Sequence, residues 1–425
     1  MAKFKYQMTK LKNGLRVLLV PNKHVDSVET VVLFRVGSRC EDPKYAGISH
    51  FLEHMFFKGT KKRPTKGDIT LEIDNVGGIL NAFTSFEYTG YHVKVAKQHI
   101  DMANDVLSDM ILYSKFVQAE LDRERGVIKE EIKMYEDDPG SYVAQTYTSV
   151  LYGEQGLGRD IAGTFETVDN INRAQMVKYK EDYYSVANGL LAVVGNYDEK
   201  KILPLLNKYW GSLPAGKPSK FVKTDDNQSK PAVKVVYRDI QQANIILGWR
   251  SFPAFHPHHF VAELLSVVLG KGMSSRLFMK VREELGLCYV IGAGSDTYTD
   301  VGNFLVRTGT DPGKAGEALK MIVEECKQLK TKQVGLKEMK KIKEYWKGKM
   351  VLAMENIEFL ANNVGMQELM FEKVISPEQM MVKIDEVTAG DIHALANEIF
   401  VTEKMNLAVV GPFKEDEGFK KLMKI

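Results

Sequence analysis

Two histidines and a glutamate occur within five residues of one another, in the order His50-Phe-Leu-Glu53-His54. In a helix, positions i, i+3 and i+4 share one face, so the three polar side chains would point in one direction. The residues around them are mostly apolar, which is typical of a buried helix. Burying two imidazoles and a carboxylate without partners is costly. The spacing therefore predicts a metal ion bound by His50 and His54.

A histidine pair alone leaves a catalytic zinc site incomplete, because such a site takes three protein ligands and keeps one position for water. The alternative interpretation of the pair is two core histidines that are hydrogen-bonded to the backbone. Choosing between the two interpretations requires a third ligand on another buried element.

The segment 120–137 is predicted to be a helix that supplies this ligand. Its apolar residues recur at spacings of seven, four and three, which makes one buried stripe. Glu124 and Glu131 lie at the edge of that stripe, whereas Glu130 faces water. Helix geometry thus selects Glu131 as the third ligand. Glu124 lies two helical turns away, behind the ligands. The stripe consists of Leu121, Ile128, Ile132 and Tyr135.

These residue types together are suited to amide hydrolysis. His50, His54 and Glu131 would hold one Zn²⁺, which lowers the pKa of a bound water toward about 7 and polarises a substrate carbonyl. Glu53 is not needed as a ligand and is predicted to be the general base that passes a proton to the leaving amine. Glu124 would not bind the metal itself but would orient one of its ligands or tune the charge of that ligand.

The motif H-x-x-E-H is the inverzincin signature. The residues around it resemble the pitrilysin family, which includes insulin-degrading enzyme and the mitochondrial processing peptidase. In size and layout the chain is most similar to the bacterial processing-peptidase-like members, which are related to the beta subunit of the mitochondrial enzyme. Beyond the motif, the resemblance rests on Glu124-Arg-Gly-Val-Ile-Lys-Glu-Glu131, on Asn81-Ala-Phe-Thr84, and on Arg282 and Tyr289, seven residues apart.

The resemblance implies that one strand edge binds the substrate backbone, through Asn81, Ala82, Phe83 and Thr84. The residues alone predict two strands, 79–85 and 89–96, joined by a turn. An exposed strand edge can bind an extended peptide, but the pattern does not show whether this strand is an edge.

The resemblance also implies that Arg282 and Tyr289 contact the substrate near the scissile bond. There they would stabilise the developing oxyanion. Without the resemblance, Arg282 would be interpreted as a surface ion-pair partner and Tyr289 as part of a half-buried strand.

The family also implies a fold, an activity and an assembly. Its members are zinc endopeptidases that enclose unfolded peptides or presequences in a chamber of four α/β-roll domains, and this chain supplies two. A homodimer is therefore expected, with Arg282 and Tyr289 reaching the zinc site of the other subunit. The alternatives are a noncatalytic core or scaffold subunit of a larger complex, or a peptide-binding partner with vestigial activity. Such subunits have usually lost motif residues, and here none is missing.

Length and composition indicate two globular domains. The chain has 425 residues, of which 44% are hydrophobic and 27% charged. A net charge of +3 argues against a nucleic-acid or membrane-surface role, and no apolar run reaches the length of a membrane span. The three cysteines, Cys40, Cys288 and Cys326, are scattered. With no signal segment at the start, we expect the cytoplasm of a prokaryote, unless a presequence has been removed.

The two halves of the chain repeat each other. The segments 168–195 and 384–411 match in apolar pattern at an offset of 216 (384 − 168), and both end in Leu-Ala-Val-Val-Gly. The order of strands and helices predicts an α+β fold, with each domain a largely antiparallel sheet covered by helices. We predict a catalytic zinc domain at 1–212, a linker at 213–231, and a metal-free domain at 232–425 for substrate binding and chamber closure.

A second group of histidines, His256, His258 and His259, lacks a carboxylate at ligand spacing. We expect it to lie at the surface without a metal ion, so that the chain would hold one Zn²⁺.

Overall fold

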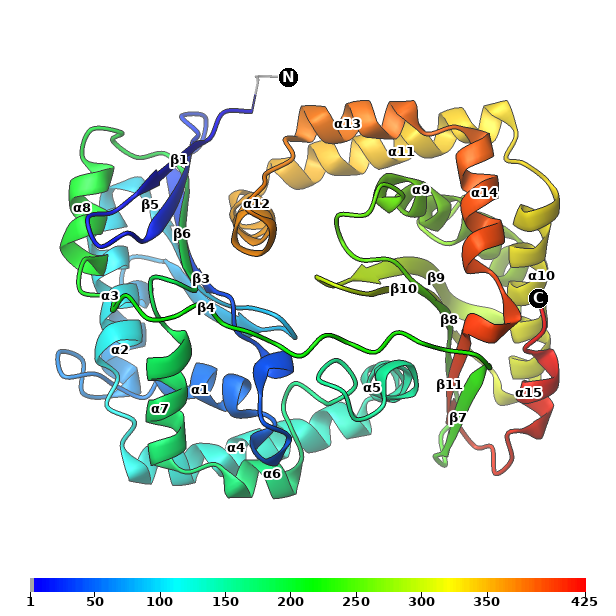
Figure 1. Ribbon diagram of the computed structural model, residues 1–425, viewed down its shortest axis with the longest axis horizontal. Coiled ribbons are helices and arrows are strands. Elements are labelled where there is room, and N and C mark those ends of the chain that lie inside the picture. The colour runs from blue at the N-terminus through cyan, green and yellow to red at the C-terminus, as the bar shows by residue number, and fades with distance from the viewer. Residues whose placement is uncertain (1–3) are drawn as a thin grey trace. The chain divides into compact units, whose positions relative to one another are not determined.

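The computed structural model describes residues 4–425, which pack as two compact units (Figure 1). Unit 1 comprises the residues up to Lys133, Arg159–Val222 and Val351–Ser376. Unit 2 comprises Met134–Gly158, Lys223–Met350 and Pro377–Ile425. None of the helices formed by residues 4–425 combines the length and apolar character needed to cross a membrane.

Unit 1 is built on a six-stranded sheet in which only the pair β2–β6 is parallel. The central strands β3 and β6 are buried along almost their whole length, because both faces of the sheet are covered. Strand β4 lies at one edge. In order across the sheet, the strands are β1 (Gln7–Lys10), β2 (Arg16–Pro21), β6 (Gly189–Gly195), β3 (Ser27–Phe34), β5 (Thr89–Ala96) and β4 (Ile79–Thr84).

Helices cover the two faces of this sheet separately. On one face, buried residues of α1, α3, α7 and α8 form a core with the sheet. On the other face, α12 packs on β3 and β6, where Leu360 and Val364 meet Val31 and Leu33. The helices of unit 1 are α1 (Ile48–Phe56), α2 (Lys66–Asp74), α3 (Ile100–Tyr113), α4 (Gln118–Asp137, which runs past the end of the unit), α6 (Phe165–Asn170), α7 (Arg173–Tyr183), α8 (Ile202–Trp210) and α12 (Ile357–Phe371), with short helices η1 (Ser38–Cys40), η2 (Pro43–Tyr45) and η3 (Lys97–His99).

Unit 2 is built on a five-stranded sheet with one parallel pair, β7–β11. Its strands in order are β7 (Ala232–Tyr237), β11 (Met405–Gly411), β8 (Ala243–Ser251), β10 (Gly302–Thr310) and β9 (Cys288–Thr297), so β9 is an edge. Its helices are α5 (Pro139–Tyr152), α9 (His259–Leu269), the π-helical η4 (Phe278–Glu284), η5 (Pro312–Lys314), α10 (Ala315–Thr331), α11 (Leu336–Met354, which runs past the unit boundary), α13 (Pro377–Glu386), α14 (Ala389–Ile399), η6 (Thr402–Lys404) and α15 (Glu417–Leu422).

The strand orders of the two sheets correspond, which confirms the predicted fold of two similar helix-covered sheets. Strands β2, β6, β3, β5 and β4 of unit 1 follow the same order as β7, β11, β8, β10 and β9 of unit 2, and β1 is extra. The starts of β2 and β7 are 216 residues apart (232 − 16), as are those of β6 and β11 (405 − 189). Corresponding strands of the two sheets are therefore separated by the same 216 residues as the sequence repeat.

The packing units differ from a division of the chain at the predicted linker, because each unit takes one helix from the other half of the sequence. Helix α5 packs on β8 and β11 of unit 2, and α12 packs on the sheet of unit 1. The amphipathic pattern of a helix shows that it has a buried face, but not which sheet it covers. The functions predicted for the two domains stay predictions.

The predicted linker, 213–231, contains no helix or strand, but its two ends are bound to different units. In unit 1, the amide of Asn188 donates to the carbonyl of Lys217, and Arg39 stacks on Phe221 at 4.0 Å. In unit 2, the backbone N–H of Thr224 donates to Asp300 over 2.9 Å. The segment is thus bound to residues of unit 1 at one end and of unit 2 at the other, along much of its length.

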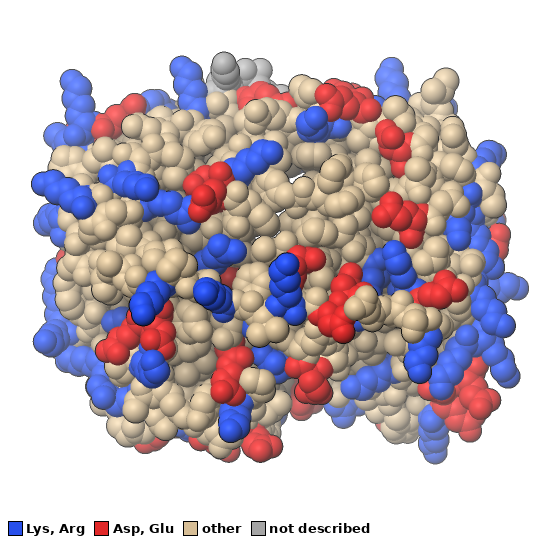
Figure 2. Space-filling model, viewed as in Figure 1, with Lys and Arg blue, Asp and Glu red and all other residues tan. Residues whose placement is uncertain are grey.

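Acidic and basic side chains are interspersed on the face shown in Figure 2, without a large area of one sign. That face agrees with the near-balanced net charge of the sequence.

Candidate metal centre

Helix α1 carries the H-x-x-E-H motif, as predicted, and its apolar face is fully buried in unit 1. Phe51, Leu52, Met55 and Phe56 have no measurable exposure. The side chains of His50 and His54 keep 12% and 20% of their exposure, so both lie at the rim of this core. The helix therefore presents its polar face at a partly open position, where a metal ion and a substrate could reach it.

The three residues predicted as metal ligands come together in unit 1. The Nε2 atoms of His50 and His54 are 3.2 Å apart. The two carboxylate oxygens of Glu131 lie 3.7 Å from His50 Nε2 and 3.4 Å from His54 Nε2. Among residues 4–425, this is the group of metal-ligating side chains that converges closely enough to hold an ion.

Helix α4 brings Glu131 to this position, and its phase agrees with the helical analysis. Leu121, Ile128 and Ile132 are buried. The Glu131 side chain is 22% exposed and faces the histidines, whereas that of Glu130 is 71% exposed and pairs with Lys133. The choice between two neighbouring glutamates therefore follows from which side of α4 packs on the core.

The donor atoms fit a tetrahedral zinc site. With ligands about 2.05 Å from the ion, a tetrahedron places donor atoms about 3.3 Å apart, close to the 3.2–3.7 Å between these atoms. Burial, together with the neighbouring His54, lowers the pKa of His50 to about 3. Its imidazole is therefore neutral near pH 7, which is the form that binds metal.

Glu124 lies behind His54 and is itself held by a lysine. His54 Nδ1 lies 2.9 Å from Oε1 of Glu124, and Lys58 Nζ lies 2.5 Å from Oε2. Burial alone would raise the pKa of Glu124, but the hydrogen bonds from His54 and Lys58 hold that pKa below its usual value. A hydrogen bond from Nδ1–H to this carboxylate leaves Nε2 of His54 free to bind a metal ion.

Glu53 is hydrogen-bonded to strand β4. The hydroxyl of Thr84, the last residue of β4, donates to Oε2 of Glu53 over 2.5 Å. Burial raises the pKa of Glu53 above its usual value, while this hydrogen bond opposes the rise. Glu53 is thus a partly buried carboxylate with one oxygen engaged, close to His54 and Glu131.

A carboxylate outside the motif binds the start of α1. Glu41 accepts hydrogen bonds from the backbone N–H groups of Gly47 and Ser49, over 2.7 and 2.8 Å. Gly47, the residue before the helix, offers no side-chain cap, so Glu41 binds N–H groups that would otherwise lack partners. Sequence reasoning missed this role, because no local pattern connects Glu41 to the helix.

Sequence reasoning also missed Lys58 and the contact between Thr84 and Glu53. Lys58 lies two residues beyond the end of α1, so the helical spacing does not place its side chain beside Glu124. Thr84 offered no local signal either, because its contact with Glu53 joins a strand to a helix 31 residues away.

The predicted substrate strand, β4, is an edge of the sheet of unit 1. Asn81 is exposed and Ala82 and Phe83 are half-buried, and β4 pairs only with β5 within the described chain. The strand therefore has an unpaired backbone edge, which the sequence pattern alone did not establish.

Arg282 and Tyr289 belong to unit 2. Arg282, on η4, stacks over Phe278 at 4.6 Å and lies 3.7 Å from Glu283. Tyr289, near the start of β9, is 76% exposed. Both are available for contacts outside the unit, and their approach to a zinc site stays a prediction.

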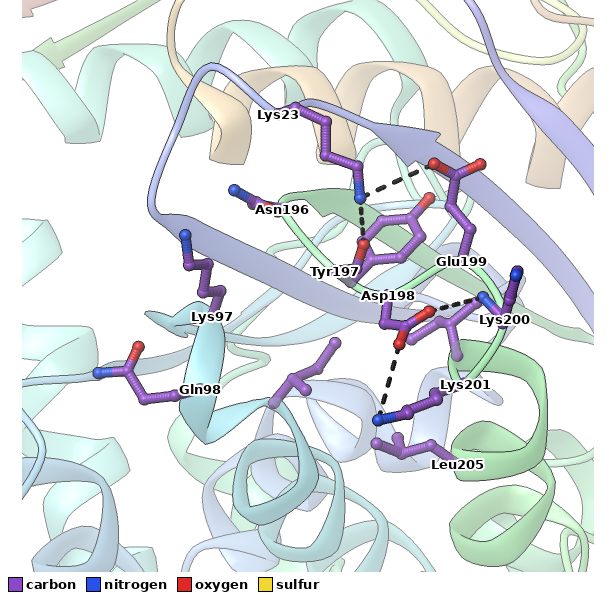
Figure 3. A pocket seen from close by; sticks show the side chains of 12 residues that line it. Lys23, Lys97, Gln98, Asn196, Tyr197, Asp198, Glu199, Lys200, Lys201 and Leu205 are labelled. Atoms are coloured by element: carbon purple, nitrogen blue, oxygen red, sulfur yellow. Dashed lines mark hydrogen bonds and ion pairs between the residues drawn. The ribbon is translucent and has the colours of Figure 1, made fainter.

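Two further features do not join the metal centre. His258 lies 3.4 Å from Glu398, and His256 stacks on Phe252 rather than converging with a ligand set. A separate hollow of about 880 Å³ in unit 1 shares no residue with the centre (Figure 3). Two of its lysines already have acidic neighbours, since Lys23 lies 3.7 Å from Glu199 and Lys201 lies 3.8 Å from Asp198.

Two family models and several curated relatives match this chain. Residues 16–165 match the family model described as insulinase (peptidase family M16), and residues 170–345 match the peptidase M16 inactive domain. The Uncharacterized zinc protease YmxG of Bacillus subtilis is 36% identical over 402 residues, which are 94% of this chain and 97% of the relative. An Uncharacterized zinc protease of Rickettsia felis is 34% identical over 411 residues, which are 96% of this chain and 98% of the relative.

Solved structures share the fold along most of the chain. A protease from Helicobacter pylori superposes with a TM-score of 0.90 at 24% identity, covering 96% of this chain and 100% of that one. A chain of Complex III2 from Candida albicans has a TM-score of 0.85 at 16% identity, covering 100% of both chains. The two domain matches and the relatives of full length show that the chain belongs to the insulinase family, peptidase family M16.

Proposed function

We propose that the protein is a zinc-dependent endopeptidase that hydrolyses unfolded peptides or presequences. The observation that carries this proposal is the convergence of His50, His54 and Glu131, with Glu53 beside them and outside the ligand set. Relatives named zinc proteases support the same activity.

His50, His54 and Glu131 are the residues that would hold the ion, one per chain. When bound, a zinc ion would polarise the scissile carbonyl and lower the pKa of a water molecule. Glu124 accepts from Nδ1 of His54 and so fixes the orientation of that imidazole. The residues around the ion therefore have separate tasks, which are binding, orientation and proton transfer.

Glu53 would carry the proton. Its Oε2 atom is engaged by Thr84, which leaves Oε1 to accept a proton from the attacking water as the new C–O bond forms. Glu53 would then deliver that proton to the amine nitrogen as the C–N bond breaks. Its raised pKa suits the first step, because a carboxylate with a higher pKa is a stronger base and accepts the proton of the water more readily.

The substrate would bind as an added strand along β4. The unpaired edge of β4 ends at Thr84, next to Glu53, so an extended peptide paired with Asn81–Thr84 would lead to the metal centre. A folded protein cannot supply such a strand without unfolding locally, which favours unfolded substrates.

A second copy of the chain would complete the site. We propose a homodimer that encloses the substrate in a chamber, with Arg282 and Tyr289 of the second copy stabilising the developing oxyanion. The exposure of Tyr289 supports this role.

For its location we propose the cytoplasm of a bacterium, where the three free cysteines would stay reduced.

The alternative is a noncatalytic subunit that scaffolds a larger complex. It is favoured by the shared fold of a chain in Complex III2 from Candida albicans and of a structure named as the peptidase M16 inactive domain from Pseudomonas fluorescens, which has a TM-score of 0.88 at 18% identity. The complete ligand set with its separate base argues for the peptidase.

The two functions are separated by zinc content and by cleavage of a quenched peptide library, with and without a chelator. A peptidase would contain zinc and cleave peptides until the chelator is added. The variant Glu53→Gln should keep zinc and lose turnover, because the amide cannot accept the proton. Full activity of Glu53→Gln would contradict the assignment of the base, and zinc-loaded protein without cleavage would favour the scaffold.

A further inference from the structure

Thr84 differs from the other residues of its strand in what its side chain contacts. Side chains alternate across a strand, so Leu80, Ala82 and Thr84 face the core that contains α1. Leu80 and Ala82 pack in that core, whereas Phe83 packs in the core on the opposite face. A peptide added to the edge of β4 would pair with backbone groups in the plane of the sheet. The Thr84 hydroxyl is therefore directed at the helix rather than at the added strand.

The contact itself is short and is made to a carboxylate. Thr84 Oγ1 donates to Oε2 of Glu53 over 2.5 Å, within the range of a charge-assisted O–H···O⁻ hydrogen bond. Threonine is stiff about χ1 because it is branched at Cβ, so its hydroxyl restrains the acceptor more firmly than a flexible donor would. The carboxylate of Glu53 is thus fixed at one oxygen and open at the other.

One segment, Gly37–Glu41, holds both partners of this hydrogen bond. At its start, the backbone N–H groups of Ser38 and Arg39 donate to the carbonyls of Ser85 and Phe86, in the turn that follows Thr84. The buried side chain of Arg39 also pairs with Glu87, in the same turn, over 2.7 Å.

At its other end, the same segment binds the helix that carries Glu53. The carboxylate of Glu41 accepts from Gly47 and Ser49 at the start of α1. The position of Thr84 relative to Glu53 is therefore set by this short segment and does not depend on the hydrogen bond alone.

We propose that Thr84 is a positioning residue whose side chain orients Glu53 for proton transfer rather than contacting the substrate. The proposal rests on the proposed peptidase function. By occupying Oε2, Thr84 directs Oε1 toward the position of the attacking water. Thr84 also ties the strand that would bind the peptide to the base that would cleave it.

Two nearly isosteric variants test the proposal. Thr84→Val removes the hydroxyl and keeps the branched shape, and Thr84→Ser keeps the hydroxyl. We expect Thr84→Val to lower kcat on a quenched peptide by about 10- to 100-fold with KM unchanged, a size typical for residues behind a metal site. Zinc content should be unchanged, and Thr84→Ser should recover most of kcat. A raised KM with unchanged kcat would overturn the proposal and make Thr84 a substrate contact.

A structural measurement separates this inference from the peptidase proposal. In crystal structures of the zinc-loaded proteins, the Glu53 carboxylate should be displaced in Thr84→Val and unmoved in Thr84→Ser. An unmoved Glu53 in Thr84→Val would overturn the positioning role, even if the wild-type protein cleaves peptides. A displaced Glu53 in a protein that cleaves no peptide would contradict the peptidase function alone. Should Thr84→Val not fold, Thr84→Ala provides the same comparison.

Discussion

Lys58 and Glu124 form a largely buried ion pair beside the metal centre, with Nζ of the lysine 2.5 Å from Oε2 of the carboxylate. His54 binds the other oxygen of Glu124, so the lysine and the histidine together fix both oxygens of one carboxylate. Lys58 thereby sets how strongly Glu124 holds the imidazole of His54.

Replacing Lys58 should weaken zinc binding. We expect Lys58→Met to lower zinc affinity by about 10- to 100-fold, because Glu124 loses the partner that fixes its second oxygen. Lys58→Arg should retain most of the affinity. Lys133→Met is the matched control, since Lys133 pairs with the exposed Glu130. Competition with a zinc-binding dye measures all three, and unchanged affinity in Lys58→Met would contradict the role of the ion pair.

Neighbouring glutamates on α4 should differ in their effect on zinc. We expect Glu131→Gln to lose most of its zinc, because the amide is a poorer ligand, and Glu130→Gln to keep it, because Glu130 faces solvent. Metal analysis of the two purified proteins decides the point. Equal zinc content in the two variants would show that Glu131 is not a ligand.

Glu41 should make stability depend on pH. Burial raises the pKa of Glu41 to about 7, although backbone N–H groups and Arg159 oppose the rise. In the unfolded chain this pKa is near 4.5, so between about pH 4.5 and 7 the folded state retains a proton that the unfolded state has released. The free energy of unfolding should therefore fall as the pH rises through this window, by up to about 3 kcal/mol.

The comparison with Glu41→Gln isolates this group. Urea unfolding of both proteins at several pH values should show a smaller fall in the variant, because its side chain does not titrate. Other titrating groups are shared by the two proteins and cancel in the difference. The same pH dependence in both proteins would mean that Glu41 keeps its ordinary pKa.

Replacing two glycines near the candidate metal centre by alanine should change the stability of the protein in opposite directions. A Cβ at Gly37 would lie 2.2 Å from the carbonyl oxygen of Ser85, so Gly37→Ala must displace the segment that holds both Thr84 and α1. We expect a loss of about 1–3 kcal/mol in the free energy of unfolding. A Cβ at Gly126, in the exposed part of α4, meets no atom within 4 Å.

Gly126→Ala is therefore the matched control, and it should stabilise the protein by about 0.5–1 kcal/mol through helix propensity. Denaturant unfolding measures both variants. If Gly37→Ala were as stable as the wild type, the close approach to Ser85 would not constrain the segment.

The convergence of the three candidate metal ligands could be predicted from the sequence, because periodicity decides which side of a helix is buried. The phase of Ile128 and Ile132 separated Glu131 from Glu130, and the 216-residue register anticipated two corresponding sheets. Both inferences used local or repeated patterns. They needed no knowledge of which elements pack together.

The supporting contacts were out of reach for the opposite reason. Glu41 binds α1 across a loop, and Thr84 reaches Glu53 from a strand, so each contact depends on how separate elements pack. The placement of α5 and α12 depends on the same kind of information. An apolar stripe shows that a helix has a buried face, but it does not show which sheet that face packs on.

The placement of α12 has a consequence for synthesis on the ribosome. Unit 1 contains the candidate metal centre, yet one face of its sheet is covered by residues 357–371, near the end of the chain. During translation, the apolar side chains of Val31 and Leu33 would stay exposed until residues 357–371 had left the ribosome. Unit 1 would thus complete its folding only after most of unit 2 had been made, and the nascent chain would need protection from aggregation for nearly the whole of its synthesis.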